Sequence, residues 1–272
     1  MLSKSHQQHD PITVLNIATN IYLDYWKSLV ISADEVTTKN DNVSFWLFTD
    51  RVEEARKFAK GIENIQINVF EIPPLGWPDA TILRYKILLQ HVSGQSNDIF
   101  VYLDADMMLE NSPWQIIRDQ MDSTDICLVE HPGYWRPRGL KRFFMYLNFP
   151  QIFLSDAKSL LKFGGLGQWE RRKISTAFVP RRLRKKYYCG GIWFGRPNSI
   201  KDLMIQLSKE VEIDRNRGIT AVWHDESHLN GWSVNNKHGV ESPKLCFDAT
   251  YPQLRGMNSY IHAVRKIESG RD

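Results

Sequence analysis

The sequence is poor in cysteine and has no long hydrophobic run. Its 272 residues include three cysteines, Cys127, Cys189 and Cys246, an odd number without the spacing of a metal-binding motif. A disulfide scaffold is therefore excluded, and a reducing compartment is favoured. No apolar run reaches the length of about 18 residues that a transmembrane helix needs, and the first ten residues lack the apolar segment of a signal peptide. We expect a soluble, cytoplasmic protein.

A strong charge of one sign is also missing. The formal net charge is +4, with 24% charged and 42% hydrophobic residues, which is ordinary for a globular protein and does not favour nucleic acid as a partner. No internal repeat, low-complexity tract or linker divides the chain. We therefore predict one domain over residues 1–272. Aromatic residues are abundant at 12%, with nine Trp, and their flat faces suit sugars and bases, although most will serve the core.

Strand and helix patterns alternate along the first half of the chain. Short β-branched or aromatic runs predict strands, and apolar residues at helical spacing predict the helices between them. The expected strands are 12–18, 45–48, 65–72 and 100–103, and the expected helices are 23–36 and 52–60. This order predicts an α/β fold with a parallel sheet and helices on its faces.

Two carboxylates, Asp104 and Asp106, directly follow the buried strand that ends at Leu103. In open α/β sheets, ligands bind beyond the carboxyl ends of the strands. Two neighbouring carboxylates repel each other, so a divalent cation bound together with a ligand's phosphates is their expected partner. An Asp-x-Asp motif can also simply cap the next turn, but the buried strand before it favours the metal site.

The first half of the chain also contains a predicted helix that begins at Pro78 and ends at about Gln90. Arg84 lies in its early turns, where a cation opposes the helix dipole. Its position fits either an anionic ligand or an arginine that is simply solvated.

The second half of the chain is less regular. A helix is expected at 114–121, a strand at 126–130 that leads to His131, and a helix at 200–211. The region 136–186 is expected to be less regular, and no helix or strand is predicted within it. Its eight basic residues between Arg171 and Lys186 fit a solvated loop or an anionic membrane surface, so peripheral membrane contact is left open.

Two further segments of this half carry polar or glycine-rich motifs. The aromatic strand 187–195 is interrupted by Gly190 and Gly191, which indicates a bulge or a ligand close to the backbone. The block 223–230 contains two histidines four residues apart, but it lacks the pattern of a zinc protease, so zinc is not favoured.

These motifs together resemble glycosyltransferase family 6. The series comprises 77–79 with Arg84, 102–106, 130–132, 187–191, 223–230, and Ser242-Pro243 before Asp248, in one order along the chain. The resemblance extends from about Ile12 to Lys266, and the block 223–230 is its most specific part. It implies a GT-A fold, with a nucleotide-sugar half at about 12–125 and an acceptor and catalytic half at about 126–272. It also implies a soluble bacterial or viral member.

The implied reaction transfers GalNAc or Gal from a UDP-sugar, with retention, to the 3-hydroxyl of a galactose-type oligosaccharide acceptor. Mn²⁺ is the implied metal, with Mg²⁺ as the alternative. By resemblance Glu226 is the catalytic carboxylate, and Asp104 and Asp106 hold the metal. The implied donor-binding residues are Ile17, Ala18, Tyr22, Arg84, Asp104, Ala105, Asp106, Gly190, Gly191, Asp225 and Lys266. The implied acceptor-binding residues are His131, Trp223, Glu226 and Asp248.

Gly191 matches the family position that faces the C2 substituent of the donor sugar. Glycine there accompanies GalNAc and alanine accompanies Gal, so the resemblance favours UDP-GalNAc over UDP-Gal. A purely conformational role for Gly190 and Gly191 is the alternative.

For the whole chain, two other functions stay open: a sugar nucleotidyltransferase on a similar fold, and a non-catalytic carbohydrate-binding protein. The first normally has a glycine-rich basic loop near its N-terminus, and 12–20 has none.

Overall fold

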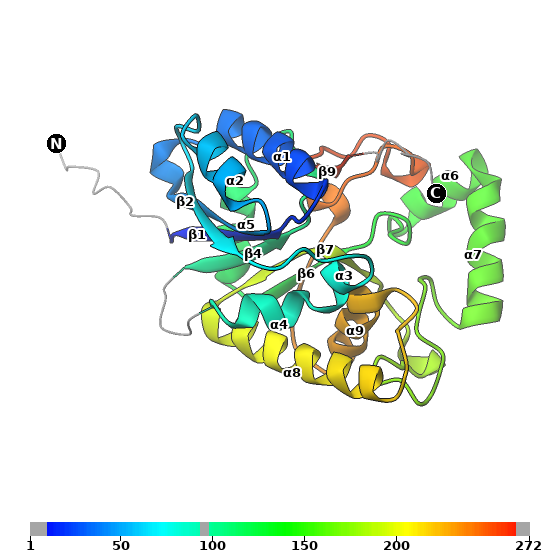
Figure 1. Cartoon of the computed structure of the whole chain (residues 1–272). Helices are drawn as coiled ribbons and strands as arrows, with labels where there is room; N and C mark the ends of the chain where they lie inside the picture. The colour runs from blue at the N-terminus through cyan, green and yellow to red at the C-terminus, as the bar shows by residue number, and fades with distance from the viewer. Residues whose placement is uncertain (1–9, 93–97, 265–272) are drawn as a thin grey trace.

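The protein has an α/β fold built on a seven-stranded mixed sheet (Figure 1). The computed structural model describes residues 10–92 and 98–264. The strand order is β3-β2-β1-β4-β7-β6-β8, with β1 to β4 parallel and β7 antiparallel to both of its neighbours. These strands are β1 (Ile12–Ile17), β2 (Val43–Thr49), β3 (Gln66–Glu71), β4 (Ile99–Leu103), β6 (Ile126–Glu130), β7 (Tyr188–Gly195) and β8 (Gly239–Glu241). The expected α/β class and GT-A-like architecture are confirmed.

Helices cover both faces of the sheet (Figure 1). One face packs against α1 (Tyr22–Val36), α2 (Val52–Ala59) and α5 (Trp114–Met121). The other face packs against α4 (Arg84–Leu89), α8 (Pro197–Asn216) and α9 (His224–Ser233), and the short helix α3 (Asp79–Ile82) precedes α4. Because the sheet is covered on both sides, β1 and β4 are buried at every residue, as their continuous apolar runs predict.

A group of short elements lies outside the main sheet. A separate antiparallel pair joins β5 (Met107–Leu109) to β9 (Ile261–Ala263). Four 3₁₀ turns are η1 (Lys39–Asp41), η2 (Arg181–Leu183), η3 (Pro243–Leu245) and η4 (Pro252–Leu254). None of the helices in the described part of the chain is long and apolar enough to cross a membrane.

Two expectations about local structure are corrected. The helix predicted up to about Gln90 is interrupted at Leu83 and forms α3 and α4 instead. The region 136–186 is not irregular throughout, because it contains α6 (Leu140–Asn148) and α7 (Pro150–Phe163). Many apolar side chains of these two helices are exposed, so their spacing does not give the single core-facing stripe by which a helix is recognised. The proposed division into two halves near residue 125 stays a prediction.

The carboxyl end of β4 meets β7 at the edge where the polar motifs gather. Leu103 pairs with Ile192, and the Asp104 N–H donates a 2.9 Å hydrogen bond to the Gly191 carbonyl. The pairing of β7 with β6 is irregular between Tyr188 and Trp193, which confirms the predicted bulge at the two glycines. This bulge brings the Gly190–Gly191 backbone against the end of β4.

Candidate active site

A cavity of about 400 Å³ opens at the carboxyl ends of β1 and β4. Its walls come from the ends of these strands, the start of α1, and the segment from Leu75 through α3 to Arg84. The expected donor-side residues Ile17, Tyr22, Arg84, Asp104, Ala105 and Asp106 all line it. Ala18 does not line it, since it is fully buried and its N–H donates to the Phe48 carbonyl. The structure thus brings together six expected residues from three separate segments of the chain, 17–22, Arg84 and 104–106.

Asp104 and Asp106 are half-buried at the floor of this cavity. Asp104 Oδ1 accepts a 2.7 Å hydrogen bond from the Tyr102 hydroxyl and lies 3.2 Å from the Arg84 guanidinium. Within the described ranges, no three His, Cys, Asp or Glu side chains converge as a metal cluster. Two carboxylates beside an open cavity are the protein ligands that a Mg²⁺-type cation uses when a bound phosphate completes its shell. The residues therefore fit such a cation only together with a ligand.

Arg84 is buried at the centre of the site and is not the solvated arginine considered above, since only 4% of it is exposed. Its guanidinium lies 3.0 Å from Asp225 Oδ2, donates a 3.0 Å hydrogen bond to the Gly190 carbonyl, and lies 4.5 Å over the Tyr102 ring. Its Nε has no hydrogen-bond partner among the residues that the structure describes. Because Arg84 contacts both Asp104 and Asp225, it holds carboxylates from β4 and α9 in one cluster.

Gly190 and Gly191 connect these groups through their backbone. The Gly190 N–H donates a 2.8 Å hydrogen bond to Glu226 Oε2, while its carbonyl accepts from Arg84. A Cβ on Gly190 would lie 2.9 Å from the Glu226 Cβ, so the close approach of α9 requires glycine here. The two glycines are thus both part of a bulge and part of the site.

Asp225 and Glu226 lie in the first turn of α9 and belong to this cluster through Arg84 and Gly190. Burial raises the pKa of Asp225 to about 7, against the opposing charge of Arg84. Burial also raises the pKa of Glu226 to about 7, although the Gly190 N–H and the Tyr187 hydroxyl favour its charged form. Carboxyl groups that titrate near neutral pH in a cleft are typical of functional sites.

Two of the expected acceptor-side residues, His131 and Asp248, interact electrostatically, and the His131 ring contacts Tyr187, which bonds Glu226. Burial lowers the pKa of His131 to about 4, partly offset by the negative charge of Asp248, so the ring is neutral at pH 7. His131 Nδ1 accepts the Gly133 N–H, and the ring contacts Tyr134 and Tyr187. Trp223 is 45% exposed and donates its indole N–H to the Gln168 side chain.

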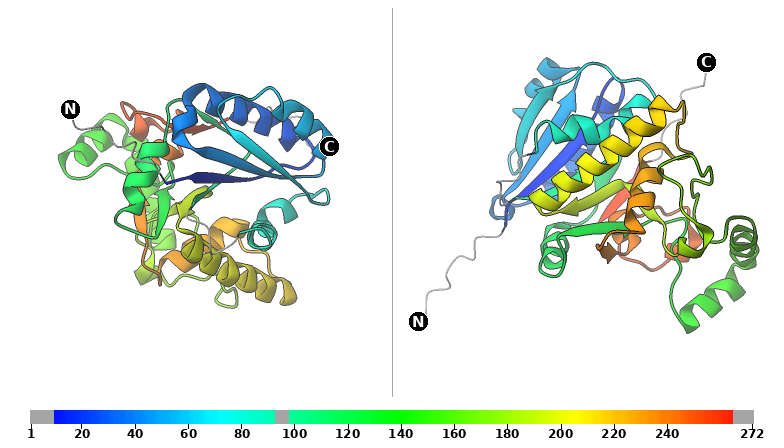
Figure 2. Two further views of the ribbon diagram at one scale, coloured as in Figure 1. Left: turned by 90° about the vertical axis from the view of Figure 1, so that its left-hand side faces the viewer. Right: turned by 90° about the horizontal axis from the view of Figure 1, so that it is seen from below.

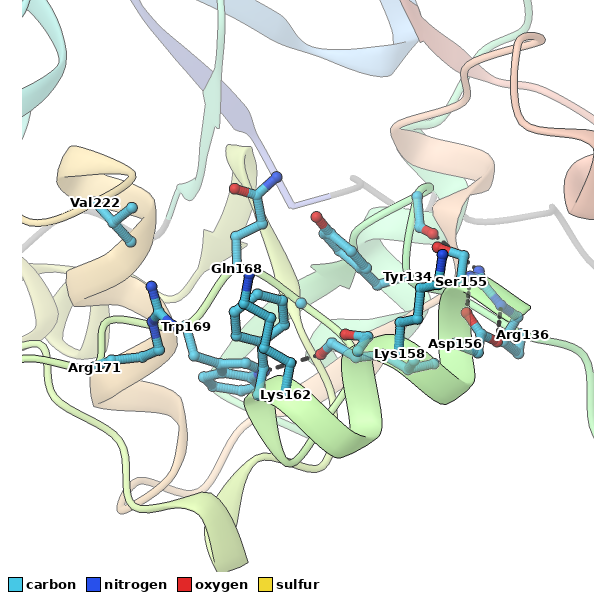
Figure 3. A pocket seen from close by; sticks show the side chains of 15 residues that line it. Tyr134, Arg136, Ser155, Asp156, Lys158, Lys162, Gln168, Trp169, Arg171 and Val222 are labelled. Atoms are coloured by element: carbon cyan, nitrogen blue, oxygen red, sulfur yellow. Dashed lines mark hydrogen bonds and ion pairs between the residues drawn. The ribbon is translucent and has the colours of Figure 1, made fainter. Parts of the chain in front are cut away.

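A second cavity, of about 540 Å³, lies between α7 and the loop that carries Gln168 and Trp169. Lys158 and Lys162 extend from α7 toward the side chains of Gln168 and Tyr134 (Figure 3). Because Gln168 also binds the Trp223 indole, this cavity adjoins the acceptor-side residues. Its aromatic and polar lining is suited to further sugar units of a glycan.

Two residues of the site, Tyr102 and Gln168, were not predicted from the sequence. Tyr102 was missed, although a residue two positions before Asp104 must share its strand face. Gln168 was also missed, and no local pattern marks it. His224 contacts Trp77, whereas His228 is buried near Asp214, so the two histidines have different surroundings. Lys266 lies outside the described residues.

Comparisons with known proteins agree with this arrangement. The model of the family described as glycosyltransferase family 6 matches residues 163–269, which include Gly190, Gly191, Asp225 and Glu226. The chain is 26% identical over 250 residues to the human globoside alpha-1,3-N-acetylgalactosaminyltransferase 1, covering 89% of this chain and 62% of that protein. It is 26% identical over 265 residues to the rat histo-blood group ABO system transferase 1, covering 96% and 66% of the two chains.

A bacterial relative matches over a larger share of its own length. The O-antigen biosynthesis glycosyltransferase WbnI of Escherichia coli is 23% identical over 228 residues, covering 83% of each chain. By contrast, the chain spans less than two thirds of the length of the human and rat relatives.

Proposed function

The chain belongs to glycosyltransferase family 6, and on this premise we propose that it transfers a hexose from a UDP-sugar to a glycan. The proposed donor is UDP-GalNAc, with UDP-Gal as the second choice, and the proposed product carries an α-1,3 linkage to a galactose-type acceptor. The observation that carries this proposal is the single cluster of Asp104, Arg84, Gly190, Asp225 and Glu226 beside the 400 Å³ cavity.

The cavity at the ends of β1 and β4 is the proposed donor site. Its apolar wall at Ile17 and the Tyr22 ring suit a flat base, and Arg84, Asp104 and Asp106 at its floor suit a diphosphate with its counter-ion. Mn²⁺, or Mg²⁺, bound by the two aspartates would supply charge neutralisation of the leaving diphosphate. One relative is named an alpha-1,3-N-acetylgalactosaminyltransferase and another a histo-blood group ABO system transferase, and Gly191 provides the local argument for GalNAc.

Glu226 is the proposed catalytic residue because its side chain bonds Gly190 of the donor-side cluster and Tyr187, whose ring contacts His131 of the expected acceptor side. A glycosyl transition state develops positive charge at the anomeric carbon, and a carboxylate close to it stabilises that charge. The Gly190 N–H holds one oxygen of Glu226, which fixes the direction of the side chain. Burial makes the anion costly without a nearby cation, so its stabilising effect is largest when positive charge develops. Both a covalent glycosyl-enzyme and a front-face reaction would use Glu226 in this place.

The acceptor is proposed to lie over Trp223, His131 and Asp248 and to continue toward Gln168 and Tyr134. The exposed Trp223 face suits a sugar ring, and the neutral His131 can donate from Nε2 because its Nδ1 already accepts the Gly133 N–H. In this arrangement the acceptor hydroxyl approaches the same side of the site as Glu226.

A simple assay separates this function from its two alternatives. A transferase releases UDP from UDP-GalNAc or UDP-Gal, faster with Mn²⁺ and an acceptor glycan. A sugar nucleotidyltransferase would instead form or consume a nucleoside triphosphate, and a carbohydrate-binding protein would turn over neither donor. Absence of UDP release from either donor, with a broad set of galactose-terminated acceptors and Mn²⁺ present, would overturn the proposal.

A further inference from the structure

Exposed apolar side chains are concentrated on the two helices α6 and α7. In the described part of the chain, fifteen large apolar residues are exposed, and eight of them lie between 140 and 161. These eight are Leu140, Phe143, Phe144, Leu147, Phe153, Leu154, Leu160 and Leu161, with exposed fractions of 49% to 80%. Single exposed apolar residues are normal, whereas a group of this size marks an interaction surface.

The two helices form a hairpin that stands away from the sheet. Figure 1 shows α7 at the right edge of the molecule, and Figure 2 shows the same hairpin protruding in the view from below. The hairpin is anchored by the buried Asp156, which accepts hydrogen bonds from Arg136 and from the Tyr146 hydroxyl. These bonds fix the hairpin to the segment that carries Arg136, while its large apolar side chains stay exposed.

The charge of this region is strongly positive. Residues 136–186 contain fourteen Lys and Arg but two acidic residues, a formal charge of +12, whereas the other 221 residues carry −8. Both acidic residues, Asp156 and Glu170, are buried and paired with arginines. Basic residues are neighbours of the apolar ones: Lys141 and Arg142 precede Phe143, and Arg181 donates to the carbonyls of Leu160 and Leu161. The positive charge and the exposed apolar side chains thus occur in the same region of the chain.

We propose that the α6–α7 hairpin docks the protein on an anionic lipid membrane, with its leucines and phenylalanines in the interface and the exposed basic residues of 136–186 on the lipid headgroups. Helices with exposed Leu and Phe beside Lys and Arg bind membranes in this way. Long basic side chains can lie along the apolar surface and reach the headgroups. A second copy of the chain is disfavoured as the occupant, because pairing two hairpins would bring two regions of +12 charge together.

Docking has a consequence for the orientation of the molecule. The second cavity lies between α7 and the Gln168 loop, so a membrane under the hairpin would lie close to this opening. The docking surface itself contains none of the residues assigned to the donor or to catalysis. Its test is therefore independent of the proposed transferase activity.

The test is binding to lipid vesicles without any sugar nucleotide, measured by flotation. Vesicles of phosphatidylcholine are compared with vesicles that also contain about one third phosphatidylglycerol. The protein should bind the anionic vesicles at least about tenfold more strongly, and added salt should weaken the binding. The combined variant Leu140→Ser, Leu147→Ser, Leu154→Ser and Leu161→Ser should lose most of it. The matched control is Ile31→Ser with Ile205→Ser on α1 and α8, two residues of 48% and 46% exposure, and it should bind as the wild type does.

A charge variant keeps the test decisive if the leucine variant fails to fold. Lys141→Glu, Lys173→Glu and Lys185→Glu change exposed residues that make no ion pair in the described part of the chain, and this variant should also lose binding to anionic vesicles. Wild-type protein that does not float with anionic vesicles would overturn the proposal, as would undiminished binding by both variants. A wild type that is dimeric without lipid, with a monomeric leucine variant, would assign the surface to a second copy and also overturn it.

Discussion

The backbone of Gly191 lies directly against Asp104. The Asp104 N–H donates to the Gly191 carbonyl at 2.9 Å, and a Cβ added to Gly191 would lie 2.7 Å from Asp104 Oδ2 and 3.0 Å from Met107 Cε. The residue proposed to select the donor sugar therefore also limits the position of a proposed metal ligand. Any side chain at residue 191 must displace the Asp104 carboxylate.

This relationship refines the prediction for Gly191→Ala. We expect the wild type to prefer UDP-GalNAc, and the alanine variant to shift the ratio of kcat/KM values toward UDP-Gal by about tenfold, because the methyl group occupies space for the acetamido group. The kcat/KM for both donors should also fall, since Asp104 must move. Steady-state kinetics with both donors measure this. A wild type that prefers UDP-Gal, or an unchanged ratio in the variant, would show that Gly191 does not select the donor.

Removing either proposed metal ligand should abolish most of the activity. Asp104→Asn or Asp106→Asn takes away part of the negative charge that offsets the cation, so UDP binding should lose its dependence on Mn²⁺. Calorimetric titration of UDP with and without Mn²⁺ measures this, and Asp122→Asn, at an exposed surface residue, is the matched control. Activity of the wild type that persists undiminished in EDTA would contradict the metal assignment.

Arg84 should be important for stability as well as for the site. Arg84→Met leaves the buried Asp225 without its cation, which is expected to lower the free energy of unfolding by about 3 kcal/mol. Adding Asp225→Asn should recover part of this loss, because the unpaired charge is removed. Urea unfolding of the two single variants and the double variant tests the pair, and Arg56→Met, in an exposed ion pair, should change little. If the changes in the free energy of unfolding of the two single variants simply add up in the double variant, Arg84 and Asp225 are not coupled.

The raised pKa of Glu226 predicts a pH dependence with a defined sign. If the anion is the active form, kcat/KM should rise with pH and level off above about 7, where the free enzyme has lost this proton. The usual pKa of a glutamate is 4.5, and that of Glu226 in the folded protein is about 7. At a pH between these two values, Glu226 is protonated more often in the native state than in the unfolded state. The contribution of Glu226 to stability therefore falls as the pH rises through this window, and Glu226→Gln should remove that part of the slope. An activity profile that is flat from pH 5 to about 8 would contradict the assignment.

Local patterns were sufficient for the sheet but not for the cluster at its edge. The run 99–103 followed by Asp104 predicted both a buried strand and a polar site, since both depend on residues adjacent in sequence. The contacts of Arg84 with Gly190 and Asp225 join residues more than one hundred positions apart, and spacing within one helix cannot reveal them. The α6–α7 hairpin escaped prediction for a different reason: its apolar residues face solvent as well as the protein.

The most direct test of the central claim is glycosyl transfer by Glu226→Gln compared with the wild type. Both proteins are incubated with UDP-GalNAc, Mn²⁺ and a galactose-terminated acceptor, and the glycan product is quantified by mass spectrometry. We predict that the wild type adds one N-acetylhexosamine residue, whereas Glu226→Gln folds, binds UDP with similar affinity and turns over at least about a thousandfold more slowly, because a neutral amide cannot stabilise the developing positive charge. Near-normal product formation by the variant would contradict the account and would assign the catalytic role to another group.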